Sequence, residues 1–181
     1  KFVNGYAEIR ARVPSGDGLW PAFWLLNAYY VGPLPEIDVM EILGEDPATA
    51  YHSFHRSDTN GVQQTDQFVT TNSNSYSDDF HTFGVRWTSS SISWYIDGTL
   101  KHTYTVPAGQ PNRAYQLMYV IANLAVGGDF NSQSVDASKL PASYDIDYIR
   151  VYHERLLMDC ILSFPHAEPE RIDALRCMDT M

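Results

Sequence analysis

The segment Glu36-Ile-Asp-Val-Met-Glu41 carries the strongest structural signal in this sequence. Its acidic and apolar side chains alternate, and a period of two is typical of a β-strand with one buried face. Glu36 and Asp38 then point to one side of the sheet, and the apolar residues between them point into a core. Glu41 has the wrong parity to join the other acids in a regular strand. We expect a β-bulge near Met40, because one extra residue returns Glu41 to the acidic face.

Three carboxylates on one strand face have a chemical consequence. Acids this close together repel, so the pKa of at least one of them must rise. A glycoside hydrolase needs such a difference, because one carboxylate must be ionised as nucleophile while another stays protonated to donate to the leaving oxygen. The alternative interpretation is a solvated strand face on an acidic protein. The sequence around the segment favours the hydrolase.

Composition restricts the class of protein and its partners. A chain of 181 residues fits one domain with a sizeable core. Four Trp, twelve Tyr and eight Phe with 19% charged residues favour a β-rich protein on which sugar rings can stack. A net charge of −10 argues against nucleic acid or an anionic membrane as partner, whereas a neutral polysaccharide is indifferent to it.

Other sequence signals are few. No apolar run reaches the length of a membrane span and no signal peptide is present, so we expect a processed or truncated chain that begins at Lys1. The two cysteines, Cys160 and Cys177, lie near the C-terminal end, and their spacing alone does not establish a disulfide.

Six further motifs accompany the acidic segment in collinear order over residues 3–152. They are Gly5-Tyr-Ala-Glu-Ile-Arg-Ala-Arg12, Gly18-Leu-Trp-Pro-Ala-Phe-Trp-Leu-Leu26, Asp79-Phe-His-Thr-Phe-Gly-Val-Arg-Trp87, Trp94-Tyr-Ile-Asp-Gly98, Asn123-Leu-Ala-Val-Gly-Gly128 and Asp147-Tyr-Ile-Arg-Val-Tyr152. Together they resemble glycoside hydrolase family 16, within it the laminarinase and bacterial exopolysaccharide-glycanase branch.

The resemblance, with about a dozen short predicted strands, implies an all-β fold. We expect a two-sheet antiparallel β-sandwich of the jelly-roll type with a concave substrate cleft. Residues 1–153 would form the catalytic domain, without the strands that family members have before the position of Lys1. Residues 154–181 would be a C-terminal tail without a counterpart in the family.

The resemblance also implies an activity, namely endo-hydrolysis of a β-glucan with retention. We expect Glu36 to attack the anomeric carbon, Glu41 to serve first as acid and then as base, and Asp38 to tune both. The extra Met in the acidic segment leans towards β-1,3-glucan or a succinoglycan-like exopolysaccharide over strictly β-1,3-1,4-linked chains. Two alternatives stay open: a non-catalytic β-glucan-binding module on the same scaffold, and a transglycosylase that uses the same acids.

Five residues are expected to contact the substrate. Trp24 leads into the acidic strand and matches an aromatic sugar platform of the family, and Trp20 shares its parity. Ser53 and His55 match positions on the following strand that hydrogen-bond sugar, and Asn123 matches an asparagine that faces it. Each has a structural alternative, since buried tryptophans are usually core, a lone histidine is usually a surface residue, and an asparagine often ends a strand.

Three aromatic residues need a separate interpretation. Phe130 stands where the family often has a tryptophan, two residues beyond the paired glycines, so the resemblance implies a weaker platform there. Trp87 and Trp94 lie in regular predicted strands, and we interpret both as core.

A structural calcium ion follows from the resemblance alone. It would be bound by Asp147 and by a backbone carbonyl near Gly5, because calcium prefers oxygen ligands; the alternative is a solvated acid. No cofactor is expected for catalysis. We expect a monomer, and the resemblance implies a secreted or extracellular protein.

Overall fold

The computed structural model describes residues 1–28, 35–109, 114, 116–131 and 134–153. Within these residues the chain forms ten β-strands and one short 3-10 helix, and no α-helix. The strands are β1 (Gly5–Arg12), β2 (Leu19–Asn27), β3 (Glu36–Ile42), β4 (Thr49–Ser57), β5 (Gln63–Thr71), β6 (His81–Trp87), β7 (Ser91–Ile96), β8 (Thr99–Thr105), β9 (Met118–Val126) and β10 (Asp145–Tyr152), and the helix is η1 (Ala137–Lys139). The predictions for Cys160, Cys177 and the tail 154–181 lie outside the described residues.

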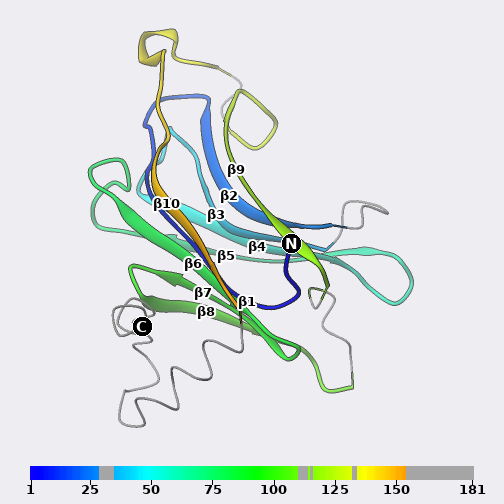
Figure 1. Cartoon of the computed structure of the whole chain (residues 1–181). Helices are drawn as coiled ribbons and strands as arrows, with labels where there is room; N and C mark the ends of the chain where they lie inside the picture. The colour runs from blue at the N-terminus through cyan, green and yellow to red at the C-terminus, as the bar shows by residue number, and fades with distance from the viewer. Residues whose placement is uncertain (29–34, 110–113, 115, 132–133, 154–181) are drawn as a thin grey trace, which may run out of the picture.

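The strands form two five-stranded antiparallel sheets, which face each other as two layers (Figure 1). One sheet has the order β10-β1-β6-β7-β8, and the other has the order β5-β4-β3-β2-β9. The predicted antiparallel β-sandwich is therefore confirmed. The acidic segment is β3, the central strand of the second sheet, so both of its neighbours fix its register.

The core lies between the two layers and explains the strand pattern. Ile9 of β1 and Phe83 of β6 are fully buried from one sheet, and Phe23 of β2 and Phe54 of β4 are fully buried from the other. The large rings of Trp87 and Trp94 are also enclosed here, as the sequence predicted. Burial of apolar surface contributes roughly 25 cal/mol per Å² to folding, so these rings anchor the sandwich.

The predicted β-bulge is present in β3. Asp38 stands opposite Ser53 of β4 and Glu41 stands opposite Tyr51, so two residues of β3 face only one residue of β4. The ladder to β2 shifts at the same place. The two residues in the bulge are Val39 and Met40, whose side chains both point into the core, with 1% and 0% exposure. The bulge therefore places two adjacent apolar side chains on one face and returns the next acid to the other.

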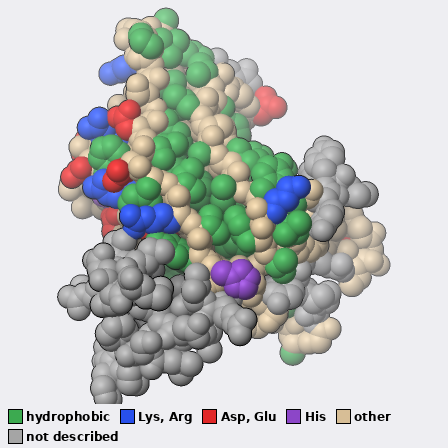
Figure 2. Space-filling view, in the orientation of Figure 1, with side chains coloured by type: hydrophobic (Ala, Val, Ile, Leu, Met, Phe, Trp, Pro, Cys, Tyr) green, Lys and Arg blue, Asp and Glu red, His purple; other side chains and the backbone are tan. Residues whose placement is uncertain are grey.

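The polar region before His81 contains β5, a nine-residue strand that starts at Gln63. Strands β9 and β10 are sheet edges. The face shown in Figure 2 is largely uncharged, and most of its charged side chains lie at the left of the view. No helix among the described residues is long and apolar enough to cross a membrane.

Candidate active site

A cleft of about 380 Å³ lies on the side of the β3 sheet that faces away from the core. Strands β2, β3, β4, β5 and β9 and the loop after β9 all contribute to it, so the site is built mainly on regular strands. Its lining consists of Trp20, Ala22, Trp24, Glu36, Asp38, Glu41, Ser53, His55, Gln67, Asn123 and Phe130. All eight residues predicted for catalysis or substrate binding are therefore brought to one cleft.

Glu36, Asp38 and Glu41 form the acid row on β3, and Glu41 is its half-buried last member. The indole Nε1 of Trp20 donates a hydrogen bond to its Oε1 at 3.1 Å. This bond favours the ionised carboxylate, but desolvation by burial and the nearby charge of Asp38 act more strongly in the other direction. Together they raise the pKa of Glu41 to about 8. The raised pKa favours the protonated form of Glu41 at neutral pH.

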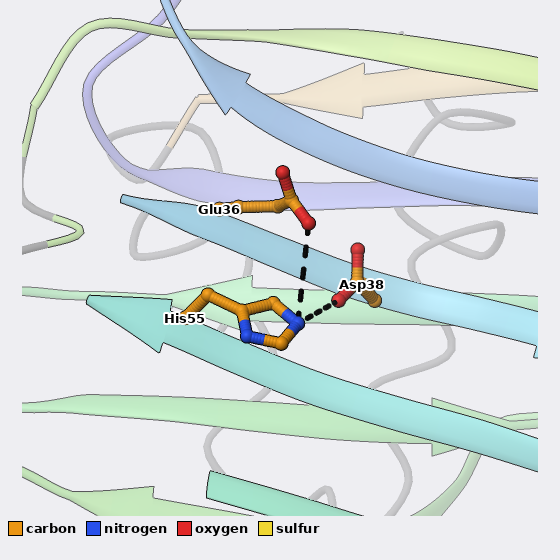
Figure 3. A group of neighbouring side chains, drawn as sticks. All are labelled: Glu36, Asp38 and His55. Atoms are coloured by element: carbon orange, nitrogen blue, oxygen red, sulfur yellow. Dashed lines mark ion pairs between the residues drawn. The ribbon is translucent and has the colours of Figure 1, made fainter. Parts of the chain in front are cut away.

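Glu36 and Asp38 share a histidine that reaches across from β4 (Figure 3). His55 Nε2 lies 3.0 Å from Asp38 Oδ2 and 3.9 Å from Glu36 Oε1. Its other ring nitrogen, Nδ1, lies 2.7 Å from the hydroxyl of Thr65 on β5. The hydrogen bond to Asp38 raises the pKa of His55, which favours a positively charged ring beside Glu36 and Asp38.

The environment separates the titration of the acids. Burial and the charge of Asp38 raise the pKa of Glu36 to about 7, while the positive charge of His55 opposes the rise. Burial also raises the pKa of Asp38, and His55 opposes that rise as well. Of the two glutamates, Glu36 has the less raised pKa, about 7 against about 8 for Glu41, which favours ionisation of Glu36 first. This order suits a nucleophile at Glu36 and a proton donor at Glu41.

Polar side chains beside the acids are held in fixed orientations. Trp24 Nε1 donates to Asn123 Oδ1 at 2.8 Å, which links β2 to β9 and leaves the Asn123 amide N–H groups free to donate to another acceptor. Gln67 Nε2 donates to Ser53 Oγ at 3.2 Å, so the Ser53 hydroxyl hydrogen can point to the cleft. Both arrangements present donors to the hydroxyl groups of a sugar.

Phe130 closes the cleft on the Glu41 side. Its ring centroid lies 5.3 Å from that of Trp20 and 5.2 Å from that of Tyr51. The phenyl ring thus packs against two neighbours as part of the wall of the cleft.

Sequence reasoning missed two residues of the site. Gln67 lines the cleft and bonds Ser53, and Thr65 bonds His55. Trp20 was predicted, but its hydrogen bond to Glu41 was not. Gln67 and Thr65 stand opposite Ser53 and His55 in the β4–β5 ladder. Parity on β5 could have identified both only with the register of β4 against β5 in hand.

Two sets of residues bear on metal binding. Single ligand atoms of Glu36, Asp38 and His55 lie within 4.8 Å of one another. In this group Asp38 Oδ2 lies 3.0 Å from His55 Nε2, so this oxygen has a partner within the protein.

The predicted calcium ligands do not fit a common site. Asp147 Oδ2 is paired with Arg10 Nη1 at 2.7 Å. In the β1–β10 ladder Tyr6 is opposite Tyr152, so Gly5 lies at the opposite end of the ladder from Asp147. Six residue positions along a strand correspond to roughly 20 Å, far beyond the reach of one ion. The sequence could not show that separation.

Comparison with known proteins adds the family context. The sequence model described as glycosyl hydrolases family 16 matches residues 1–150. The chain is 37% identical to an endo-1,3-1,4-beta-glycanase of Rhizobium meliloti over 148 residues, which are 82% of this chain and 30% of that protein. It is 34% identical to a glucan endo-1,3-beta-glucosidase of Niallia circulans over 166 residues, which are 83% of this chain and 24% of that protein.

A solved structure is also similar to this chain. The endo-beta-1,3-glucanase of Pyrococcus furiosus is 38% identical, with a TM-score of 0.69, and the match covers 81% of this chain and 60% of that one. The chain thus spans less than a third of the length of the two relatives and about three fifths of the solved structure.

Proposed function

Because the chain belongs to glycosyl hydrolase family 16, we propose that it is an endo-acting β-glucan hydrolase that cleaves with retention. The observation that carries this proposal is that Glu36 and Glu41 line one cavity in different surroundings, Glu36 beside His55 and Glu41 beside Trp20. Glu41, with a pKa raised to about 8, and Glu36, with a pKa raised to about 7 beside His55, line the same cavity. One acid can therefore donate while the other attacks.

The proposed reaction has two balanced steps. In the first, Glu36 attacks the anomeric carbon, the glycosidic bond breaks, and Glu41 gives its proton to the departing oxygen. A glycosyl ester on Glu36 results. In the second, water attacks the same carbon from the opposite face, Glu41 takes its proton, and Glu36 leaves as a carboxylate. Two inversions give net retention, and His55 with Asp38 adjusts the charge around Glu36 throughout.

The substrate class follows from the lining and from the relatives. An uncharged polysaccharide suits a cleft with two tryptophan rings and amide and hydroxyl donors, on a chain with a net charge of −10. One of the two relatives is named a glucan endo-1,3-beta-glucosidase and the other an endo-1,3-1,4-beta-glycanase. We therefore expect laminarin to be a substrate, with lichenan and succinoglycan as the competing candidates.

Product analysis tests the activity. Reducing ends should appear on laminarin early and as oligosaccharides of mixed length, as endo-cleavage requires. NMR of the first products should show the β-anomer before mutarotation. Binding to all three polysaccharides without reducing ends would replace the hydrolase by the binding module. Longer products on addition of an acceptor sugar, without free reducing ends, would identify a transglycosylase.

The pH profile tests the assignment of the two acids. As pH falls through about 7, Glu36 gains a proton and can no longer attack, so kcat/KM should decrease. As pH rises through about 8, Glu41 loses the proton that the leaving oxygen needs, so kcat/KM should decrease again. We expect a bell with its maximum between these values, whose two limbs report the coupled pair of acids. A rate that keeps rising above about pH 9 would contradict a protonated Glu41.

A further inference from the structure

The bulge in β3 is supported from the core side by two side chains that no part of the proposed chemistry uses. Trp94 of β7 donates its indole Nε1–H to the backbone carbonyl of Asp38 at 2.9 Å. His52 of β4 lies with Nδ1 2.7 Å from the backbone carbonyl of Val39. One donor comes from the opposite sheet and the other from the neighbouring strand, and they hold two consecutive carbonyls of the bulge.

These two bonds are needed because of where the bulge lies. A β-bulge interrupts the ladder of backbone hydrogen bonds. Strand β3 is central in its sheet, so an interrupted carbonyl has no open edge from which to reach water. A buried carbonyl without a donor is costly, and the chain supplies side-chain donors instead. Trp94 has 1% exposure and His52 has 0%, so water does not compete for either bond.

The tautomer of His52 follows from its partner. A carbonyl can only accept, so Nδ1 carries the hydrogen and Nε2 is bare. Nε2 is buried among the described residues without a hydrogen-bond partner. The stack on Phe68, with centroids 4.5 Å apart, fixes the ring, and Phe68 in turn packs edge-on against Trp94 at 5.3 Å. His52, Phe68 and Trp94 thus form one ring cluster beneath the bulge.

We propose that Trp94 and His52 are positioning residues that fix the β3 bulge and thereby hold Glu41 in the cleft. The effect of this positioning on catalysis rests on the proposed function. Neither side chain touches the cleft, and both act through the backbone of the residues that precede Glu41. Without their hydrogen bonds, Val39 and Met40 lose the restraint that keeps both side chains in the core, and the orientation of Glu41 relative to Glu36 loosens.

The first test compares two tryptophans of the same sheet. In Trp94→Phe the ring is kept and the donor to Asp38 is lost. We expect kcat on laminarin to fall by about 10- to 100-fold with KM changed by less than about twofold, because misplacing a reacting group by about 1 Å has an effect of this size. Trp87→Phe is the matched control, since its Nε1 donates to the Val3 carbonyl at 2.8 Å, away from the bulge. It should keep the wild-type kcat.

The second test uses His52 and serves if Trp94→Phe does not fold. His52→Leu removes the donor, whereas His52→Asn places an amide N–H close to the position of Nδ1. We expect His52→Leu to lower kcat and His52→Asn to restore a substantial part of it. A purely space-filling role would predict the reverse order, because leucine replaces the buried volume better. Equal kcat in both variants and in wild type would overturn the proposal.

Hydrogen exchange separates this inference from the proposed function. The backbone amides of Met40 and Glu41 should exchange at least about tenfold faster in Trp94→Phe than in Trp87→Phe, because local opening of the bulge becomes easier. This readout requires no activity. If wild type hydrolyses no glucan, the proposed function fails and exchange alone judges the positioning role. If wild type is active but the bulge amides exchange alike in both variants, the positioning role fails.

Discussion

Replacement of Glu36 by glutamine should reduce kcat on β-glucan by about 10⁴-fold or more, because the amide cannot form the glycosyl ester on which both steps depend. The change is nearly isosteric and removes a carboxyl that is costly to bury. Burial raises the pKa of Glu36 to about 7, so its contribution to stability is lost as pH rises through that value. Glu36→Gln should therefore unfold no earlier than wild type at about pH 8. Reducing-end release and thermal unfolding measure the two effects.

A second acid-to-amide change controls for this result. Asp147→Asn removes a carboxylate that is half exposed and paired with Arg10. An exposed ion pair contributes about 0–1 kcal/mol, so we expect a small loss of stability and wild-type turnover. The same variant also examines the calcium expectation, since unchanged thermal stability in excess calcium and in chelator agrees with the absence of a common site. Wild-type turnover in Glu36→Gln would remove Glu36 as nucleophile.

The fold and the acid row could be predicted because their signals are local. Alternation sets the face of Glu36 and Asp38, and the adjacent apolar pair Val39-Met40 breaks that alternation by one residue. A strand can bury two consecutive side chains on one face only with a bulge. The six residues of the acidic segment therefore sufficed to predict the face of the sheet on which Glu41 lies. The structure has the bulge at the predicted place.

The remaining features depend on which strands become neighbours. Thr65 lies ten residues from His55, and its contact depends on the register of β4 against β5. Trp87 and Trp94 are equally buried, yet one bonds the carbonyl of Val3 and the other that of Asp38 in the opposite sheet. No local pattern distinguishes them. The predicted calcium ligands do not meet for the same reason. Asp147 and Gly5 were each matched to the family separately, and such matches do not say how far apart the two residues lie.

Replacement of Glu41 by glutamine should have the second large effect, with a dependence on substrate that identifies its role. On β-glucan the loss of the proton donor should lower kcat/KM by about 10²–10⁴-fold. On a dinitrophenyl β-glycoside the leaving group departs without a proton, so formation of the glycosyl ester on Glu36 should approach the wild-type rate. The ester then accumulates, because no base activates water for the second step, and a burst of dinitrophenol reports it.

Azide tests the second step independently of Glu41, since it attacks the glycosyl ester without a general base. Added azide should speed turnover of Glu41→Gln on the aryl substrate and give the β-glycosyl azide, the anomer that retention at Glu36 requires. Glu36→Gln should not give the β-glycosyl azide under either change, because no glycosyl ester can form on residue 36. The pH profile of Glu41→Gln should also lose its alkaline limb, as the group with a pKa near 8 is gone. An α-glycosyl azide would instead mean direct displacement and an exchange of the proposed roles of the acids.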